Sequence, residues 1–305
     1  MVQLQLVCTA EDTFNDIKVT FLSRYMTTEA TRLQGLDKFY TKSDIVRKCL
    51  SSVDWDKWDF VIEPSAGNGS FFVQIPVTCK IGLDIEPEND DIIKCNFFDY
   101  YPPSDKGRIL VVGNPPFGKV SSTAIKFFNH ASEWCDCIAF IVPKTFRRIS
   151  VQNKLNLYFH LIHDEDIPNK PCSFEPPMSV KCCFQIWERR ESQRDIIHLP
   201  VVHRDWDFLH MGPKDTRGQP TPPDGADFAL RAYGGKCGHI ETNNLDKLRP
   251  KSWHWIKSNI EKDELIQKFK MLDYSVSEDT ARQNSIGKAE LVSLYSSSFD
   301  HNNEP

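Results

Sequence analysis

The sequence lacks the features that define several large classes of protein. Its ten cysteines include no paired CxxC spacing, so the common zinc-cluster patterns are absent. No apolar run is long enough to span a bilayer, and the N-terminal MVQLQLVCTAEDTF has neither the basic nor the apolar region of a secretory signal. We therefore expect an intracellular protein, cytoplasmic or nuclear and not secreted, with no metal and no membrane partner. Its cysteines would be structural thiols.

The composition is that of a folded globular protein. The 305 residues are 40% hydrophobic, 26% charged and 11% aromatic, and at roughly 150 residues per domain the length predicts about two domains. The formal net charge of −5 argues against a protein that coats nucleic acid without specificity. Basic residues nevertheless gather in two stretches, 144–154 and 231–257. Each is either a solvated face or a surface for an anionic partner.

The first two thirds of the chain alternate between strand-like and helix-like segments. Apolar runs bounded by turn residues are WDFVIE, CKIGLD, DIIKC, RILVVG and CIAFIV, followed by YFHLIHDEDI and VKCCFQIWE. Several are almost continuously apolar, as in parallel strands buried on both faces. Segments of helical character lie between them at residues 43–53, 70–75, 122–134 and 146–155. This alternation predicts an open, mostly parallel α/β sheet of seven strands.

The composition changes after about Arg190. Residues 212–225, GPKDTRGQPTPPDG, are dense in Gly and Pro and predict a loop. Beyond it we expect a strand pair around AYGGKCGHIET, with Gly234 and Gly235 as turn residues, and a helix over 260–271. The tail after Ser296 is polar and is expected to fray. Residues 191–305 therefore form a C-terminal α+β extension to the part that ends near residue 190.

A glycine-rich turn follows the first strand of the expected sheet. In VIEPSAGNGSF, residues 61–71, the strand ends at Glu63, and small residues including Gly67 and Gly69 lead toward a helix start. Such a turn at the carboxyl end of a parallel strand is where open α/β sheets bind nucleotide-like cofactors, although the spacing is neither GxGxxG nor a P-loop. Asp84 ends the next strand about twenty residues on, where a carboxylate can accept hydrogen bonds from ribose hydroxyls.

The most specific segment is GNPPFG, residues 113–118. Pro115 keeps Asn114 out of the α region, and two consecutive prolines give the backbone one stiff path away from the strand. The side-chain oxygen of Asn114 and the carbonyl of Pro115 are then two preorganised acceptors, and Phe117 can stack on a planar ring. An exocyclic amino group, with two N–H donors on a flat ring, is the matching ligand.

These three segments, in this order and spacing, resemble the class I S-adenosylmethionine-dependent methyltransferases that methylate an amino nitrogen, most closely the gamma-type DNA adenine-N6 enzymes. KFYTK, residues 38–42, resembles the family motif that closes over the methionine part of the cofactor. FIVPKTFRR resembles the fifth strand and the loop beside the active site, and NSIGKAELVSLY is similar to the carboxyl end of phage-like or viral members. The resemblance implies a Rossmann-like methyltransferase domain over residues 1–190 and a candidate target-recognition region over 191–305.

The resemblance also implies a cofactor site for S-adenosyl-L-methionine. Residues 40–42 would lie near its methionyl end, and Ile85 would pack on its adenine ring. Family members often close the adenine pocket with Asp-Phe. This chain has Asn96 and Phe97 there, with Asp99 three residues on, so either Asn96 or Asp99 would contact the adenine. The implied set is Tyr40, Thr41, Lys42, Glu63, Pro64, Ser65, Ala66, Gly67, Gly69, Asp84, Ile85, Asn96, Phe97 and Asn114.

The activity implied is direct methyl transfer to the N6 amino group of a flipped adenine in DNA. The implied catalytic residues are Asn114, Pro115, Pro116 and Phe117. Adenine-N6 methylation of RNA stays open, because the same acceptor geometry serves both polymers. Methylation of a glutamine side-chain amide stays open as well, although family members that do this carry Tyr where Phe117 stands. A non-catalytic binding module is disfavoured by the intact glycine turn and Asn114.

Basic residues are candidates for contacts with nucleic acid. Lys144, Arg147, Arg148 and Lys154 follow the fifth strand and would border the active-site mouth, where they could bind phosphates. In the second basic stretch, two tryptophans at 253 and 255 alternate with cationic residues. That pattern fits either a nucleic-acid surface or a strand packed on a core. The sequence does not indicate an oligomeric state or a recognition sequence.

Overall fold

The structure, a computed structural model, describes residues 38–300, so the predictions about Cys8 and the N-terminal stretch lie outside the described residues. The chain divides into two compact units. The first unit holds the residues up to Pro143 together with Ser150–Asp195, and the second holds Lys144–Ile149 together with Ile196 and all that follows. The six-residue insertion 144–149 thus belongs to the second unit, although it lies within the sequence of the first.

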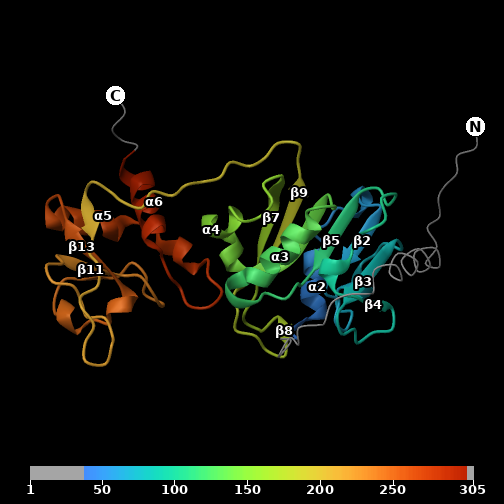
Figure 1. Cartoon of the computed structure of the whole chain (residues 1–305), viewed down its shortest axis with the longest axis horizontal. Helices are drawn as coiled ribbons and strands as arrows, with labels where there is room; N and C mark the ends of the chain where they lie inside the picture. Colours follow the sequence, from blue (N-terminus) through green and yellow to red (C-terminus); the bar gives the residue numbers. More distant parts are fainter. Residues whose placement is uncertain (1–37, 301–305) are drawn as a thin grey trace, which may run out of the picture. The chain divides into compact units, whose positions relative to one another are not determined.

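The first unit is built on a seven-stranded sheet of order β4-β3-β2-β5-β6-β9-β7 (Figure 1). Its neighbours pair in parallel from β4 to β6, while β9 runs antiparallel to both β6 and β7. This confirms the predicted Rossmann-like sheet of seven mostly parallel strands. The strand bounds are β2 Phe60–Glu63, β3 Lys80–Asp84, β4 Ile92–Lys94, β5 Ile109–Gly113, β6 Cys137–Pro143, β7 Phe159–Ile167 and β9 Cys182–Arg189.

Both faces of this sheet are buried, which explains the continuous apolar runs. Helix α2 (Ser43–Leu50) packs its apolar side, including Val46 and Leu50, into one cluster with alternate residues of β5 and β6. Helix α3 (Ser122–Ala131) packs on strand residues outside that cluster. Its Phe128 makes edge-to-face contacts with Phe159 of β7 and Trp187 of β9, at 5.6 Å between ring centroids in each case. The central strands β2, β5 and β6 are buried at every position.

The strand order creates one topological switch point. After β2, the chain adds β3 and β4 on one side of it and then crosses to add β5 on the other. At such a point the loops that leave two neighbouring parallel strands diverge and open a crevice outside the carboxyl ends of the strands. Glu63 at the end of β2 and Asn114 just after β5 therefore flank the expected ligand site.

All four helices expected in the first two thirds are shorter than predicted, and two of them form only single turns. Only a 3-10 turn, Phe72–Gln74, forms within residues 70–75, because Pro76 disfavours helical backbone at Ile75. Lys80 donates to the carbonyls of Phe72 and Ile75, at 2.8 and 2.6 Å, and so satisfies the end of this turn. Residues 146–155 form a 3-10 turn, Lys144–Arg147, and a single turn of helix, α4 (Ile149–Gln152).

The second unit has its own four-stranded antiparallel sheet of order β10-β13-β11-β12. Its bounds are β10 Trp206–Phe208, β11 Phe228–Arg231, β12 Ile240–Glu241 and β13 Trp253–Ser258. Ile256 faces a core formed with α5 (Lys262–Met271) and α6 (Lys288–Phe299). Trp253 and Trp255 alternate with it and are buried in a separate small cluster. The tryptophan alternation is therefore that of a strand packed on a core.

One local expectation in this unit is confirmed and another is wrong. The expected strand pair β11–β12 forms, and its connection, residues 232–239, contains both Gly234 and Gly235 in a turn where the Cys237 N–H donates to the Gly234 carbonyl at 3.2 Å. The tail does not fray after Ser296, because α6 continues to Phe299. Tyr295 of that helix is fully buried, and its ring lies 5.0 Å from that of Phe299, which holds the last turn.

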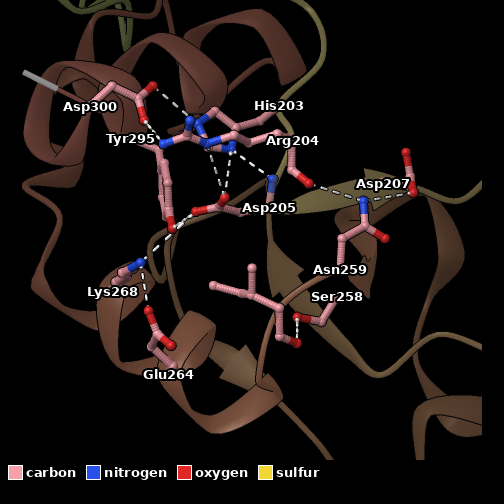
Figure 2. A network of polar contacts seen from close by, with 11 residues as sticks. His203, Arg204, Asp205, Asp207, Ser258, Asn259, Glu264, Lys268, Tyr295 and Asp300 are labelled. Carbon is pink, nitrogen blue, oxygen red and sulfur yellow. Dashed lines mark hydrogen bonds and ion pairs between the residues drawn. The ribbon is translucent and has the colours of Figure 1, made fainter. Parts of the chain in front are cut away.

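A polar network joins β10 to α6 and α5 in the second unit (Figure 2). His203 accepts from the Asp205 N–H at Nδ1, at 3.1 Å, so its proton is on Nε2, which donates to Asp300 at 3.1 Å. The Tyr295 hydroxyl donates to Asp205 at 2.7 Å, and the His203 ring stacks 4.5 Å from that of Trp206. The network fixes the end of the chain's last helix by partners far apart in sequence.

Candidate active site at the carboxyl edge of the large sheet

The glycine turn is held by Asp84, as a cofactor-binding turn requires. The Gly67 N–H donates to Asp84 Oδ2 at 2.7 Å, and the Glu86 N–H donates to Oδ1 at 2.8 Å. Gly67 and Gly69 have φ of +52° and +88°, a backbone region that favours glycine. The strand-end carboxylate thus orders the loop while each of its oxygens keeps a second lone pair for a ligand.

Tyr40 lies against this turn, while the Lys42 N–H donates to the Ser173 carbonyl at 3.0 Å. Strand β1 (Tyr40–Thr41) pairs antiparallel with β8 (Phe174–Glu175). A Cβ on Gly67 would lie 3.0 Å from a ring carbon of Tyr40, so the aromatic ring rests on the glycine backbone. Thr41 is 4% exposed, and its Oγ1 has no hydrogen-bond partner among the described residues.

Glu88 holds Tyr40 in place, a role the sequence analysis missed. The Tyr40 hydroxyl donates to Glu88 at 2.6 Å, and Lys38 Nζ donates to the same oxygen at 2.8 Å. The Glu88 N–H in turn donates to the Gly67 carbonyl at 3.0 Å. Burial, together with the hydrogen bond to Glu88, raises the pKa of Tyr40 to about 12. Acidic residues crowd after Asp84, at Glu86, Glu88, Asp90 and Asp91, and this acidic run is the only sequence signal for the contact.

In the turn that begins at Asn114, the side-chain oxygen Oδ1 of Asn114 is an acceptor without a hydrogen bond from the described residues. Asn114 Nδ2 donates to the Phe39 carbonyl at 3.2 Å, and the Asn114 carbonyl accepts from Ser65 Oγ at 3.2 Å. The first bond orients the side-chain amide, and the second holds the backbone of Asn114. Its Oδ1 is buried and has no hydrogen-bond partner within residues 38–300. A buried acceptor without a partner costs about 1–3 kcal/mol, so this atom is suited to receive a donor from outside the chain.

The rest of GNPPFG leaves one ring at the site. Pro115 is buried and Pro116 exposed. Phe117 is half-buried and packs against the apolar cluster beneath the sheet. Its carbonyl accepts from Thr123 and from the following residue at the start of α3, at 3.2 and 3.3 Å. The backbone around Phe117 is therefore fixed at both ends, while part of its ring stays accessible.

Glu63 supplies a second buried oxygen without a partner. The side chain is 2% exposed, and its Oε2 has no hydrogen-bond partner in the described part of the chain. Gly113 makes room for it, since a Cβ there would lie 3.1 Å from Glu63 Cγ. Burial raises the pKa of the Glu63 carboxyl well above its ordinary value, although an N–H of Phe72 bonds to it. Glu63 thus links the ends of β2 and β5.

The raised pKa of Glu63 predicts a specific pH dependence. The native carboxyl stays protonated at pH values where the unfolded one, with a pKa near 4.5, has ionised. The free energy of unfolding of the wild type therefore falls by up to about 1.4 kcal/mol per pH unit as the pH rises from the unfolded pKa of this carboxyl to its folded pKa. Glu63→Gln should remove this loss, so its free energy of unfolding in urea rises relative to wild type between pH 5 and pH 8. A flat difference, equal to that of the exposed control Glu191→Gln, would contradict the burial argument.

The residues expected around the cofactor's adenine ring differ in how accessible they are to a ligand. Ile85 is 40% exposed and available to a ring. Asn96 instead caps the 3-10 turn Phe97–Asp99 by accepting from the Phe98 N–H, and its Nδ2 donates to Asp99 at 3.1 Å. Phe97 is turned into the core, where it stacks on Phe127 at 5.0 Å. The assignments of Asn96 and Phe97 to the adenine pocket stay predictions. Asn96 and Asp99 are hydrogen-bonded to each other, so they are not two independent candidates.

The four predicted phosphate contacts do not form one group. Lys154 lies in the first unit, and the other three lie in the second. Arg148 donates to the carbonyls of Asp279 and Ser285, at 2.7 and 2.5 Å, and pairs with Glu290 at 3.2 Å. Arg147 lies 3.5 Å from the carboxylate of Asp279. These two arginines thus anchor residues 144–149 inside the second unit.

Two further observations concern metals and membranes. Among residues 38–300, no three His, Cys, Asp or Glu side chains come together as metal ligands. Within the same range, no helix is both long and apolar enough to cross a bilayer. Four of the described cysteines, Cys49, Cys95, Cys135 and Cys137, are buried free thiols.

The chain was compared with known families and structures. No protein-family model matches it, and neither does any curated protein. Among solved structures it is similar to the 23S rRNA methyltransferase ErmE, at 13% identity over 53% of this chain and 72% of that one, with a TM-score of 0.39. It is also similar to a dimethyladenosine transferase from Plasmodium falciparum, at 17% identity and a TM-score of 0.38, covering 50% of this chain and 63% of that one. The chain thus spans less than two thirds of the second protein, and TM-scores below 0.5 do not determine activity or substrate.

Proposed function

We propose that this chain transfers a methyl group from S-adenosylmethionine to the N6 amino group of adenine in nucleic acid, with DNA as the favoured polymer. One observation carries the proposal. Asn114 Oδ1 is a buried acceptor without a partner among the described residues, and it stands in a stiff Asn-Pro-Pro turn beside the switch point of the sheet. An amino N–H of a base would satisfy it.

The residues of the site fit the cofactor. Backbone at Gly67 and Gly69 has no side chain to keep a ligand away, and Asp84 retains lone pairs for ribose hydroxyls. Thr41 Oγ1 and Glu63 Oε2 are oxygens without a partner among the described residues, and a methionyl ammonium group bound beside Glu63 would lower the pKa of that carboxyl and make it an acceptor. When bound, S-adenosylmethionine supplies an electrophilic methyl group. This fit rests on groups that the protein itself leaves unpaired.

The chain contributes mainly orientation to the reaction. Asn114 Oδ1 and the Pro115 carbonyl accept the two hydrogens of the amino group and so set the direction of its lone pair. Phe117 stacks on the base, which is worth about 1–3 kcal/mol and offsets part of the few kcal/mol needed to flip it from a duplex. No cysteine nucleophile takes part, because the amino nitrogen attacks directly and loses its proton to water afterwards.

Defined oligonucleotides test the chemistry. Oligonucleotides in which every adenine is replaced by purine, which lacks the 6-amino group, should accept no labelled methyl, while the parent sequences do. Matched DNA and RNA versions show which polymer is used. Equal labelling of the purine-substituted and parent oligonucleotides would contradict transfer to N6.

A further inference from the structure

A cationic pocket lies in the second unit, far in sequence from the glycine turn. It has a volume of about 260 Å³, and its lining includes Arg231, Lys247 and Arg249 and no acidic residue. Lys247 and Arg249 are exposed, and neither forms an ion pair with an acid among the described residues. Unpaired cations around a concave surface favour an anionic ligand.

The same pocket presents an aromatic face. The Tyr233 side chain is 47% exposed at its rim, whereas Trp253 is 8% exposed and forms part of the packed sheet beneath. The Arg231 guanidinium lies 5.2 Å over the Trp253 ring, and its Nε donates to the Tyr233 carbonyl at 3.0 Å. Arg231 is thus fixed in place, with its terminal nitrogens left to meet a ligand. A fixed cation beside an open ring suits a group with a charge and a flat ring.

We propose that this pocket binds one nucleotide unit of a polynucleotide, with the phosphate on Arg231, Lys247 and Arg249 and the base against Tyr233. Its volume is below the 300–1,000 Å³ typical of sites that enclose a drug-sized ligand. Its size therefore suits one phosphate with its base at the surface. The assignment to a polymer rather than a free nucleotide rests on the proposed function, and it makes the second unit a contributor to substrate binding.

The residues that carry this site come from two segments. Arg231 ends β11 and is followed by Tyr233 and Gly234 in the connection to β12, whereas Lys247 and Arg249 come after β12. Gly234 has φ of +95°, which turns the chain after Tyr233 and leaves that ring exposed. The anionic side chains of this region, Glu241 and Asp246, do not line the pocket.

The test is binding of the full chain to a labelled oligonucleotide without methyl donor, so it is independent of methyl transfer. The double variant Lys247→Ala/Arg249→Ala should bind about 10-fold or more weakly, and the slope of log affinity against log salt should fall by at most about 0.7–0.9, because the pocket holds one phosphate. Tyr233→Ala should weaken binding about 10-fold with the slope unchanged. The control Lys262→Ala/Lys270→Ala removes the same charge from exposed positions of α5.

The outcomes separate the pocket from general charge. Equal weakening by both double variants, or binding by the pocket variants that equals wild type, would overturn the site. Displacement of the oligonucleotide by equimolar AMP would overturn the assignment to a polymer and make the pocket a site for a free nucleotide. Methyl transfer with unchanged KM in the pocket variants would leave the proposed function standing and would contradict a role of the pocket in substrate binding. Unchanged near-ultraviolet circular dichroism shows that each variant is folded.

Discussion

Asn114→Ala is expected to lower the rate of methyl transfer by about 10²–10³-fold or more, while S-adenosylmethionine still binds. Removing one preorganised hydrogen-bond group from a site of developing charge typically has an effect of that size. Here the lost atom is the buried Oδ1 that has no partner among the described residues. The groups that fit the cofactor, at Glu63, Gly67 and Asp84, stay in place.

Two measurements on Asn114→Ala separate orientation from folding. Calorimetry gives the cofactor dissociation constant, which should stay within a few-fold of wild type, and single-turnover kinetics gives the transfer rate. Asn243→Ala, at an exposed position in the second unit, is the matched control and should transfer at the wild-type rate. Full activity of Asn114→Ala would refute the role of Asn114. A parallel loss of cofactor binding would assign Asn114 to holding the cofactor and not to orienting the amino group.

Asp84→Ala is expected to weaken binding of S-adenosylmethionine by about 100-fold or more. The carboxylate accepts from the N–H groups of Gly67 and Glu86, and hydrogen bonds to a charged group contribute about 1.5–3 kcal/mol each. Its loss leaves the glycine turn without its anchor and removes the acceptor proposed for the ribose. The two N–H bonds act within the chain, so the affinity is counted from the two bonds proposed to the ribose hydroxyls. At about 1.5 kcal/mol each and 1.4 kcal/mol per tenfold change in affinity, their loss gives about two orders of magnitude.

The control for Asp84→Ala comes from the same acidic run. Asp91 is exposed and its side chain is not part of the glycine-turn contacts. Asp91→Ala should bind the cofactor as wild type does. If both variants bound equally well, Asp84 would be an ordinary strand-end carboxylate, and the cofactor site would have to lie elsewhere.

The local parts of the site could be predicted because each depends on a few consecutive residues. Strand, small-residue turn and strand-end acid follow from the run of apolar and glycine positions, and the stiff turn at Asn114 follows from its two prolines. The contacts between these segments could not be predicted. Ser65 to Asn114 and Asn114 to Phe39 join residues 49 and 75 positions apart, and only the sheet order brings them together.

The basic residues show what a local sequence pattern leaves out. In a stretch free of acids, Arg148 is predicted to contact phosphate, and this stays a prediction. Its partners, Asp279 and Glu290, lie more than 130 positions away and were invisible to a local pattern. The alternating tryptophans of β13 fit either a nucleic-acid surface or a strand packed on a core. Both are buried in the structure, which shows the packed strand. Lys247 and Arg249 keep their charge unpaired because no acid lines their pocket.

The measurement that tests the account most directly is the identity of the methylated product. Labelled S-adenosylmethionine is offered with the full chain to matched pools of duplex DNA, structured RNA and protein extract, and each pool is digested and analysed by mass spectrometry. The account predicts N6-methyladenine, with DNA as the labelled pool and none formed by Asn114→Ala. Methylglutamine in the protein pool, or no label in any pool despite measured cofactor binding, would contradict it.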